Sequence, residues 1–587
     1  MGDYNYFSED CPIDIDKSRG IFDKESSWVR PGRLWQKYYP KYIPKTLDYE
    51  TLEKYNGLYC ILKASAEKFF PNNISLNFFQ QNLKYSYREV DYYSMKIASA
   101  LEGIGVKKGD PVALMAKSCP EFVFAMWACI KLGAILVPIN PLLKKKEVNH
   151  ILSDCGNVKT AIIHEDNFGL FKRSAKDLGL DDVVLIQQKG LDKSLEGANL
   201  HVFDELMKKN EPMTKKIVIN MKDDIFCLLY TGGTTGLPKG VMLTHFNVLA
   251  NINQLGSSAD DYQVLIDEEL GKYTFLNVLP LCHSFGIIST LTYSTGGGML
   301  IVLDKFDAGL ILKLIEMYKV GNFSGVPTMY IMLAQHEDFH KRDLTSLSNV
   351  ITAGAALAPA VAKKWQEIAK IEVRQGYGLT ECSPGTHLQP YKWFKWIPES
   401  IGIPIIDTDV KVVDPITLEE LEPGQPGEFL IRGPQVMKGY WKKPEATASV
   451  LIKDKEGKTW LRTGDIGYMD ENGVFYISGR TKEMIKYKGY RILPAEVEAG
   501  LYEHPAVLEC GVIGIPDETV GERIKAFIKL KPSYKDKITA EEIQEWAKEN
   551  MAAYKWPREI EFISSIPKTS VGKVMRRALR DKELKNS

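Results

Sequence analysis

The sequence has no excess of charge of either sign. Its 587 residues include 75 Lys+Arg and 75 Asp+Glu, so the formal net charge at pH 7 is zero. A chain with this balance has no long-range field that would attract nucleic acid or an anionic membrane. We therefore expect no nucleic-acid partner, and a ligand must be recognised by a local arrangement of side chains.

The sequence also has few cysteines, and none of them forms a paired motif. The nine cysteines are scattered without a single C-x-x-C spacing, which argues against structural zinc and against a disulfide framework. The first stretch, MGDYNYFSEDCPIDID, is acidic and lacks the apolar run of a secretory signal. Together these features predict reduced thiols and a cytoplasmic location.

Apolar segments that would span a bilayer are lacking as well. Residues 122–130 are too short before Lys131 interrupts them, and the uncharged run 284–303 contains Gly296-Gly297-Gly298 and several hydroxyl side chains. Both stretches are expected to be core elements of a folded domain. A peripheral contact with a membrane stays open, because it needs no spanning segment.

The chain does have enough length and apolar content, 44%, for at least two domains. Residues 1–55 show no clear period and are expected to form an irregular extension. Helical and strand patterns then alternate, which predicts a mostly parallel α/β sheet, with buried strands at 111–115, 134–138, 160–163 and 182–186. Short strands with Pro/Gly turns at 401–432 suit a small β-barrel-like subdomain, and the pattern after residue 483 suits a small α+β domain.

One stretch, YTGGTTGLPKG at 230–240, has the composition of a phosphate-binding loop. Its glycines let backbone amides approach an anion, its threonines add hydroxyl donors, and its lysine adds a positive charge. The relevant residues are Thr231, Gly232, Gly233, Thr234, Thr235, Gly236 and Lys239. It is not a Walker A motif, because Leu237 and Pro238 separate the last glycine from the lysine. An expected strand at 225–229 and an expected helix at 244–255 place the loop where α/β folds bind phosphates. The alternative is a Gly-rich surface turn.

Two later segments combine small residues with an aromatic face. Gly354, Ala355 and Ala356 leave room beside an expected strand end, and Tyr377 lies between Gly376 and Gly378. An adenine ring fits that description, although ordinary close packing of a strand and a helix would use the same residues. Asp465 lies in a Thr-Gly-Asp turn, where its carboxylate either accepts ribose hydroxyls or caps its own turn.

The loop YTGGTTGLPKG resembles the signature of the acyl-adenylate-forming enzymes, which include acyl-CoA synthetases, luciferases and adenylation domains of peptide synthetases. Its Thr-Gly-Gly opening is most similar to that of bacterial long-chain fatty-acid CoA ligases. Further motifs resemble the family in the same order along the chain: LNVLPLCHSFG, TAGAALAPAV, RQGYGLTECSP, WLRTGDIGYM, GRTKEMIKYKGYRI and IPKTSVGK. The resemblance extends from about residue 85 to residue 577.

This resemblance implies a role for each candidate residue. It implies that His283 orients the acyl carboxylate, that Glu381 binds Mg²⁺, and that Lys573 is the catalytic lysine of adenylation, with Lys239 steering phosphates. Thr231 as a second metal ligand stays open. The contacts with ATP and AMP are assigned to Thr231, Gly232, Gly233, Thr234, Thr235, Gly236, Lys239, Gly354, Ala355, Ala356, Gln375, Gly376, Tyr377, Gly378, Thr380, Asp465, Arg480 and Lys573.

The same resemblance implies two domains that move relative to each other. A large AMP-binding domain is expected at 56–479, a hinge at 480–482 with Lys482 as its pivot, and a mobile C-terminal domain at 483–587. The channel for CoA is assigned to Lys486, Gly489 and Arg491, although many relatives have Gln where this chain has Arg491.

The implied activity is an ATP-dependent, AMP-forming acyl-CoA synthetase. It would convert a fatty acid, ATP and CoA into fatty acyl-CoA, AMP and pyrophosphate through a bound acyl-adenylate, with medium to long chains favoured and Mg²⁺ accompanying ATP. The alternatives are a CoA ligase for an aromatic or short hydroxy acid, a module that loads a carrier protein, and a catalytically silent lipid-binding protein. A homodimer stays open.

Overall fold

The computed structural model describes residues 21, 24–69, 71–172, 179–186, 197–231, 237–258, 273–488, 490–517, 519–568 and 574–586. The chain divides into two compact units. The first comprises Met1–Ala353, Leu357–Asp409 and Arg432–Leu461, and the second comprises Gly354–Ala356, Val410–Ile431 and Arg462–Ser587. The hinge expected at 480–482 concerns movement between domains and stays a prediction.

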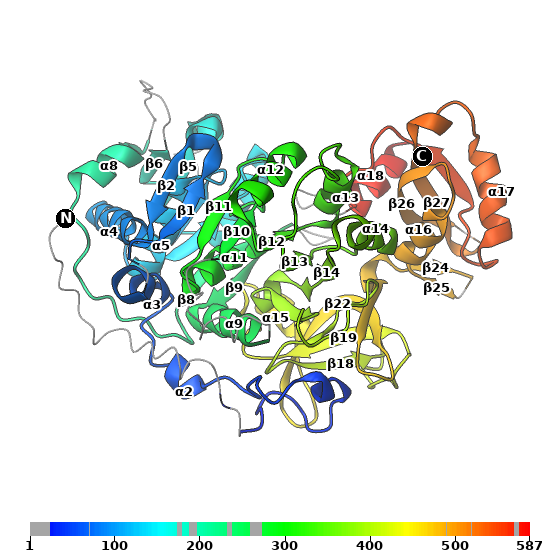
Figure 1. Cartoon of the computed structure of the whole chain (residues 1–587), viewed down its shortest axis with the longest axis horizontal. Coiled ribbons are helices and arrows are strands. Elements are labelled where there is room, and N and C mark those ends of the chain that lie inside the picture. The colour runs from blue at the N-terminus through cyan, green and yellow to red at the C-terminus, as the bar shows by residue number, and fades with distance from the viewer. Residues whose placement is uncertain are drawn as a thin grey trace. The chain divides into compact units, whose positions relative to one another are not determined.

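The first unit contains an eight-stranded sheet in which six neighbouring strands are parallel (Figure 1). Its order is β20 (Gly439–Tyr440), β9 (Lys239–Thr244), β8 (Ile225–Thr231), β4 (Ile135–Pro138), β3 (Pro111–Met115), β5 (Thr160–His164), β6 (Asp182–Ile186) and β7 (Asn199–Val202). The central strands are buried on both faces, as their continuous apolar runs predicted.

The helices of this region begin and end at residues that suit helix termini. In α4 (Tyr87–Gly103), Ser86 and Glu89 form a capping box. Helix α5 (Pro120–Leu132) begins with a proline and ends at Gly133, whose φ is 65°. A side chain at Gly133 would also meet Ile219 Cδ1 at 2.6 Å, so glycine is required there for two reasons.

A seven-stranded sheet in the same unit is parallel except for its last strand. Its order is β14 (Arg374–Gln375), β13 (Asn349–Thr352), β12 (Asn322–Gly325), β10 (Thr274–Asn277), β11 (Met299–Val302), β1 (Ile74–Phe78) and β2 (Leu83–Ser86). The uncharged run at 284–303 forms α11 (Ser284–Thr295) and β11. In the part of the chain that the structure describes, no helix combines the length and apolar character needed to cross a bilayer.

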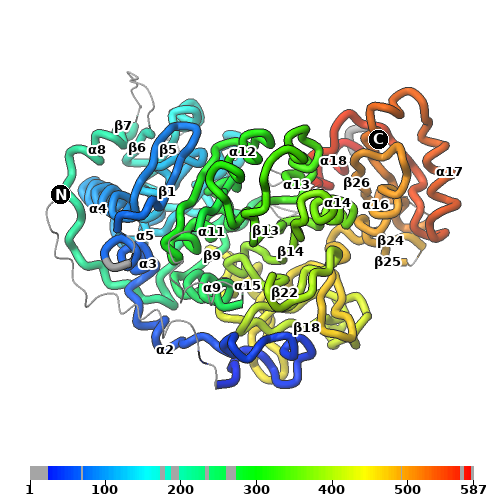
Figure 2. Tube along the Cα trace, viewed as in Figure 1, coloured from blue at the N-terminus to red at the C-terminus, as the bar shows by residue number. Residues whose placement is uncertain are grey.

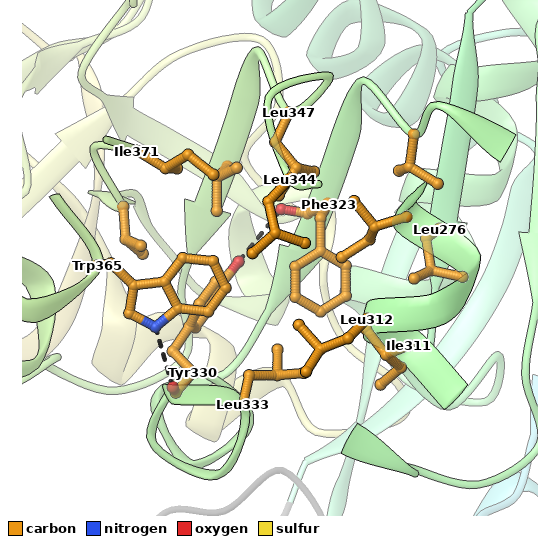
Figure 3. Close-up of a cluster of buried hydrophobic side chains, with 14 of the residues drawn as sticks. Leu276, Ile311, Leu312, Phe323, Tyr330, Leu333, Leu344, Leu347, Trp365 and Ile371 are labelled. Atoms are coloured by element: carbon orange, nitrogen blue, oxygen red, sulfur yellow. Dashed lines mark hydrogen bonds between the residues drawn. The ribbon is translucent and has the colours of Figure 1, made fainter. Parts of the chain in front are cut away.

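Large aromatic side chains fill the core beside this sheet (Figure 3). Trp365 of α14 (Pro359–Ala369) packs edge-on against Tyr330 of α13 (Pro327–Gln335), with ring centroids 5.4 Å apart. Trp365 Nε1 donates to the Tyr330 carbonyl at 3.0 Å, and the Tyr330 hydroxyl donates to the Ile351 carbonyl at 2.8 Å. Because their polar atoms are paired, both rings are buried without a desolvation penalty.

The second unit ends in an α+β arrangement. Strands β25 (Tyr490–Ile492), β24 (Ile485–Tyr487), β27 (Gly521–Leu530) and β26 (Val507–Asp517) are neighbours in that order, and β28 (Glu559–Phe562) pairs with β27. The helices are α16 (Pro494–Tyr502), α17 (Ala540–Asn550) and α18 (Arg576–Asn586). Antiparallel strands β22 (Thr459–Met469) and β23 (Phe475–Arg480) precede them. The predicted fold class is therefore confirmed.

The N-terminal segment is built into the first unit around one buried carboxylate. Figure 2 shows its blue trace after residue 24, most of it without regular helices. Asp407, 1% exposed, accepts hydrogen bonds from the Leu47 amide at 2.8 Å and from the hydroxyls of Tyr49 and Thr46 at 2.6 and 3.1 Å. Ser26 donates to its other oxygen. These contacts fix a segment that the sequence predicted only as an irregular extension.

Asp407→Ala is expected to destabilise the protein strongly, because it leaves several buried donors without an acceptor. Each such donor costs ~1–3 kcal/mol. The measurement is the urea midpoint of unfolding, with Asp181→Ala as the control, because the Asp181 side chain is 60% exposed and pairs with surface Lys159 at 3.2 Å. Equal midpoints for the two variants would contradict the assigned role of Asp407.

Candidate active site

The ends of two neighbouring strands carry the described part of the phosphate loop. Strands β8 and β9 are antiparallel, and Thr231 lies opposite Lys239 in their register. The remaining loop residues, Gly232, Gly233, Thr234, Thr235 and Gly236, lie outside the described residues. The strand expected at 225–229 and the helix expected at 244–255 are present as β8 and α9 (His245–Ser258), but the unexpected strand β9 lies between the loop and that helix. Val241 and Leu243 are fully buried and keep the chain extended after the loop.

Tyr440 contacts both Lys239 and Glu381. Lys239 Nζ lies 5.1 Å from the centre of the Tyr440 ring, and the Tyr440 hydroxyl donates to Glu381 Oε1 at 2.8 Å. Tyr440 was not among the residues selected from the sequence, since it lies about 200 positions from the loop and belongs to no motif considered there. Only the pairing of β20 with β9 brings it next to Lys239.

His283 and Thr380 lie on neighbouring elements. His283 is the N-cap of α11, where its Nδ1 accepts from the Phe285 amide at 3.3 Å. The next residue, Ser284, has its Oγ 3.3 Å from Thr380 Oγ1 in the turn Thr380–Cys382. The half-buried imidazole therefore has a structural role as a helix cap, and it is the neighbour in sequence of Ser284, which contacts Thr380.

The Gln-Gly-Tyr-Gly segment is tightly constrained. The Gln375 side chain accepts from the Leu357 amide at 2.9 Å and donates to the Pro398 carbonyl at 2.5 Å, so both ends of its amide are used within the protein. A Cβ at Gly378 would lie 2.1 Å from the Pro384 carbonyl oxygen, whereas one at Gly376 would make only ordinary contacts. Tyr377 is half-buried and lies 5.5 Å from the His387 ring.

The candidate ribose residues form a pair within the second unit. Asp465 and Arg480 are opposite each other in the register of β22 and β23, and Arg480 Nε donates to Asp465 Oδ1 at 2.6 Å. The Asp465 side chain is 8% exposed and that of Arg480 is 43% exposed. Since the guanidinium already occupies one oxygen, the carboxylate is oriented before a ligand arrives. Gly354, Ala355 and Ala356 also belong to this unit.

The described residues of the expected hinge and CoA channel lie around one hairpin. Lys482 is exposed in the short helix Thr481–Glu483, and Lys486 is exposed in β24, where its amide donates to Glu522 at 2.7 Å. Arg491 is opposite Lys486 in the register of β24 and β25, while its side chain lies outside the described residues, as does the whole of Gly489.

Lys573 also lies outside the described residues, which include both of its flanks. Lys568 and Val574 form an antiparallel bridge, and the Met575 amide donates to the Pro567 carbonyl at 2.8 Å. Arg576 then donates to Glu483 at 2.7 Å and to both oxygens of Glu498 at 2.9 and 2.7 Å. The described flank that follows Lys573 is therefore held by a buried ion cluster.

The described residues could bind Mg²⁺ only if a phosphate group supplied further ligands. Among them, no group of three or more His, Cys, Asp or Glu side chains could hold a metal ion. Glu381 offers one carboxylate, and its Oε1 is already held by Tyr440. Because Mg²⁺ in nucleotide sites keeps waters and phosphate oxygens and needs only one or two carboxylates, this donor set fits a metal that arrives with ATP.

Comparison with known proteins places the chain in a family. A model of the AMP-binding enzymes matches residues 62–441, and one of the AMP-binding enzyme C-terminal domain matches residues 496–573. A long-chain-fatty-acid–CoA ligase of Bacillus subtilis (strain 168) is 37% identical over 582 residues, which cover 95% of this chain and 99% of that protein.

Solved structures of CoA ligases are similar as well. ATP-bound MatB from Rhodopseudomonas palustris has a TM-score of 0.80 at 26% identity and is covered over 98% of its length, against 90% of this chain. The anthranilate CoA ligase AuaEII in complex with anthranoyl-AMP has a TM-score of 0.77 at 30% identity, with the same coverage.

The chain belongs to the family of AMP-binding enzymes. Within that family it is an AMP-forming acyl-CoA synthetase, with ATP and CoA as co-substrates and Mg²⁺ accompanying the ATP.

Proposed function

We propose that this acyl-CoA synthetase acts on medium- to long-chain fatty acids. The observation that carries the proposal is its similarity over almost the whole length to a long-chain-fatty-acid–CoA ligase of Bacillus subtilis. The loop opening Thr231-Gly232-Gly233 is further support. An aromatic acid is the second candidate, because AuaEII, which is 30% identical, was solved with anthranoyl-AMP.

The first step in this proposal is attack of the fatty-acid carboxylate on the α-phosphorus of ATP. A P–O bond to the carboxylate forms, the bond to pyrophosphate breaks, and no proton moves. Lys239 and the Thr231 hydroxyl bind the leaving phosphates, His283 orients the acid, and Lys573 stabilises the charge that develops at the α-phosphate. Glu381 is the carboxylate that would hold Mg²⁺, which would supply neutralisation of the phosphate charge when bound with ATP.

The nucleotide contacts in this proposal follow the resemblance. Asp465, fixed by Arg480, accepts the ribose hydroxyls, and Tyr377 with the small residues of Gly354–Ala356 borders the adenine. Thr380 lies near the α-phosphate. The amide of Gln375 is already bonded within the protein, so its part is to fix the turn at Leu357.

In the second step the CoA thiolate attacks the acyl carbonyl, the thioester C–S bond forms, and AMP leaves with the carboxylate-derived oxygen. A protein nucleophile is not required, since each step uses a substrate atom. Rotation at Lys482 would withdraw Lys573 and bring the channel residues Lys486, Gly489 and Arg491 to the acyl-adenylate.

A panel of acids tests the substrate. Pyrophosphate release and acyl-CoA formation are measured with ATP, CoA and saturated acids from acetate to octadecanoate, together with 4-coumarate and anthranilate. We expect kcat/KM to rise with chain length up to the long-chain acids, because each methylene buried in an apolar channel contributes ~0.8 kcal/mol. A kcat/KM for octanoate to octadecanoate no higher than that for acetate, or a preference for the aromatic acids, would contradict the proposal.

The same panel decides the alternative of a silent lipid-binding protein, since that protein would bind acids without releasing pyrophosphate from ATP. A cytoplasmic location, a peripheral membrane contact and a homodimer remain predictions. Sedimentation of the purified protein with and without lipid vesicles measures the last two.

A further inference from the structure

The geometry points to Tyr440 as a positioning residue that holds Lys239 and Glu381 apart and aims both at the phosphate side of the site. Its ring lies 5.1 Å from Lys239 Nζ, and its hydroxyl donates to Glu381 Oε1 at 2.8 Å. The inference rests on the roles proposed above for Lys239 and Glu381, and it adds a residue that no motif of the sequence had suggested.

The backbone around Tyr440 is fixed to both of its targets. Gly439 and Tyr440 pair with Met242 and Val241 of β9, and the Trp441 amide donates to the Gly240 carbonyl at 2.8 Å, next to Lys239. On the other side, the Met437 amide donates to the Glu381 carbonyl at 2.9 Å. A single short segment therefore sets the distance between the lysine and the carboxylate.

The C-terminal end of α6 (Lys145–Cys155) anchors that segment. Trp441 Nε1 and Lys442 Nζ both donate to the Cys155 carbonyl, at 2.8 and 2.9 Å, and so satisfy an end carbonyl of the helix. Lys443 pairs with Asp154 at 2.5 Å, and the Asp154 side chain is only 9% exposed. These bonds leave the segment little freedom to shift.

The same helix end also fixes the strand that enters the phosphate loop. The Tyr230 hydroxyl donates to Asp154 Oδ2 at 3.1 Å, and burial raises the pKa of Tyr230, so the phenol stays a donor. Its ring lies over Gly240, where a Cβ would come within 3.1 Å. The C-terminal end of α6 therefore holds both the strand that leads to Thr231 and the segment that carries Tyr440.

The arrangement has a chemical consequence for both charges. A direct Lys239–Glu381 ion pair would neutralise the cation that phosphate needs and the anion that Mg²⁺ needs, and the ion pairs found among the described residues do not include it. The phenol occupies one carboxylate oxygen and leaves the other for a metal. The face of the Tyr440 ring attracts the Lys239 ammonium through a cation–π interaction, which leaves its positive charge in place.

Two variants separate the hydroxyl from the ring. In Tyr440→Phe the ring beneath Lys239 remains and the bond to Glu381 is lost, so the affinity for ATP should fall about 10-fold in the presence of Mg²⁺ and stay unchanged in its absence. In Tyr440→Leu the ring is lost too, so the affinity should also fall about 3-fold without Mg²⁺. The measurement is calorimetric titration of the purified full-length protein with ATP, with and without Mg²⁺.

Tyr318→Leu is the matched control, because Tyr318 also lies beneath a lysine, with Lys84 Nζ 5.6 Å from its ring centre. It should bind ATP as the wild type does. Wild-type affinity in both Tyr440 variants, or an equal loss by Tyr440→Phe with and without Mg²⁺, would overturn the inference. If the wild type itself failed to bind ATP, the proposed function would be contradicted. If the wild type binds ATP and the Tyr440 variants bind it equally well, only the inference about Tyr440 fails.

Discussion

Lys573→Ala is expected to lower the rate of acyl-adenylate formation by about 100-fold or more, which is the usual cost of losing one group that stabilises a developing anion. Thioester formation from a supplied acyl-adenylate should continue at close to the wild-type rate, because the amine acts only while the α-phosphate is pentacoordinate. The measurement is a pair of half-reactions: pyrophosphate release from ATP and acid, and acyl-CoA formation from synthetic acyl-adenylate and CoA.

Lys568→Ala is the control for that experiment. Lys568 lies on the near flank of the same segment, bridges to Val574 through the backbone and pairs with Glu509 at 3.0 Å. Its loss removes a partly exposed ion pair, which contributes little, and should leave both half-reactions close to wild type. If Lys573→Ala slowed the two half-reactions equally, the lysine would be supporting the domain and not the first step.

Arg576→Leu is expected to destabilise the second unit by ~3–5 kcal/mol, the usual effect of removing one partner from a buried charge cluster. The side chains of Arg576, Glu483 and Glu498 are 15%, 11% and 11% exposed. Without the guanidinium, two carboxylates would remain buried near each other. The measurement is thermal unfolding followed by limited proteolysis of the C-terminal region.

The pH dependence of this variant has a definite sign. Burial raises the pKa of Glu498, and Arg576 opposes that rise in the wild type. In the variant the folded-state pKa lies further above that of the unfolded chain, so the folded form binds more protons and its stability falls as the pH increases. The variant should therefore recover stability on acidification. Arg577→Leu is the control, since Arg577 is 57% exposed, and a comparable loss there would contradict the account.

Elements with strong local signals could be predicted from the sequence. Strands β3 and β6 have the predicted bounds, because continuous apolar runs decide them locally. The fold class followed from the alternation of helices and strands. By contrast, β9 was missed, since its extended conformation depends on pairing with β8 and not on its own composition.

Contacts between distant parts of the chain could not be predicted in this way. Tyr440 reaches Glu381 and Lys239 only because β20 joins the edge of the sheet, and Asp407 collects donors from a segment some 360 residues earlier. Neither residue has a local pattern that indicates its partners. For Lys573, Gly489 and residues 232–236, which lie outside the described part of the chain, the roles rest on the resemblance and stay predictions.

The central claim is that the carboxylate oxygen of a fatty acid becomes bonded to the α-phosphorus of ATP. Hexadecanoic acid labelled with ¹⁸O in its carboxylate, incubated with the protein, ATP, Mg²⁺ and CoA, tests it directly through mass spectrometry of the products. The account predicts one labelled oxygen in the AMP and none in pyrophosphate. Label in inorganic phosphate, or acyl-CoA formed with unlabelled AMP, would contradict it.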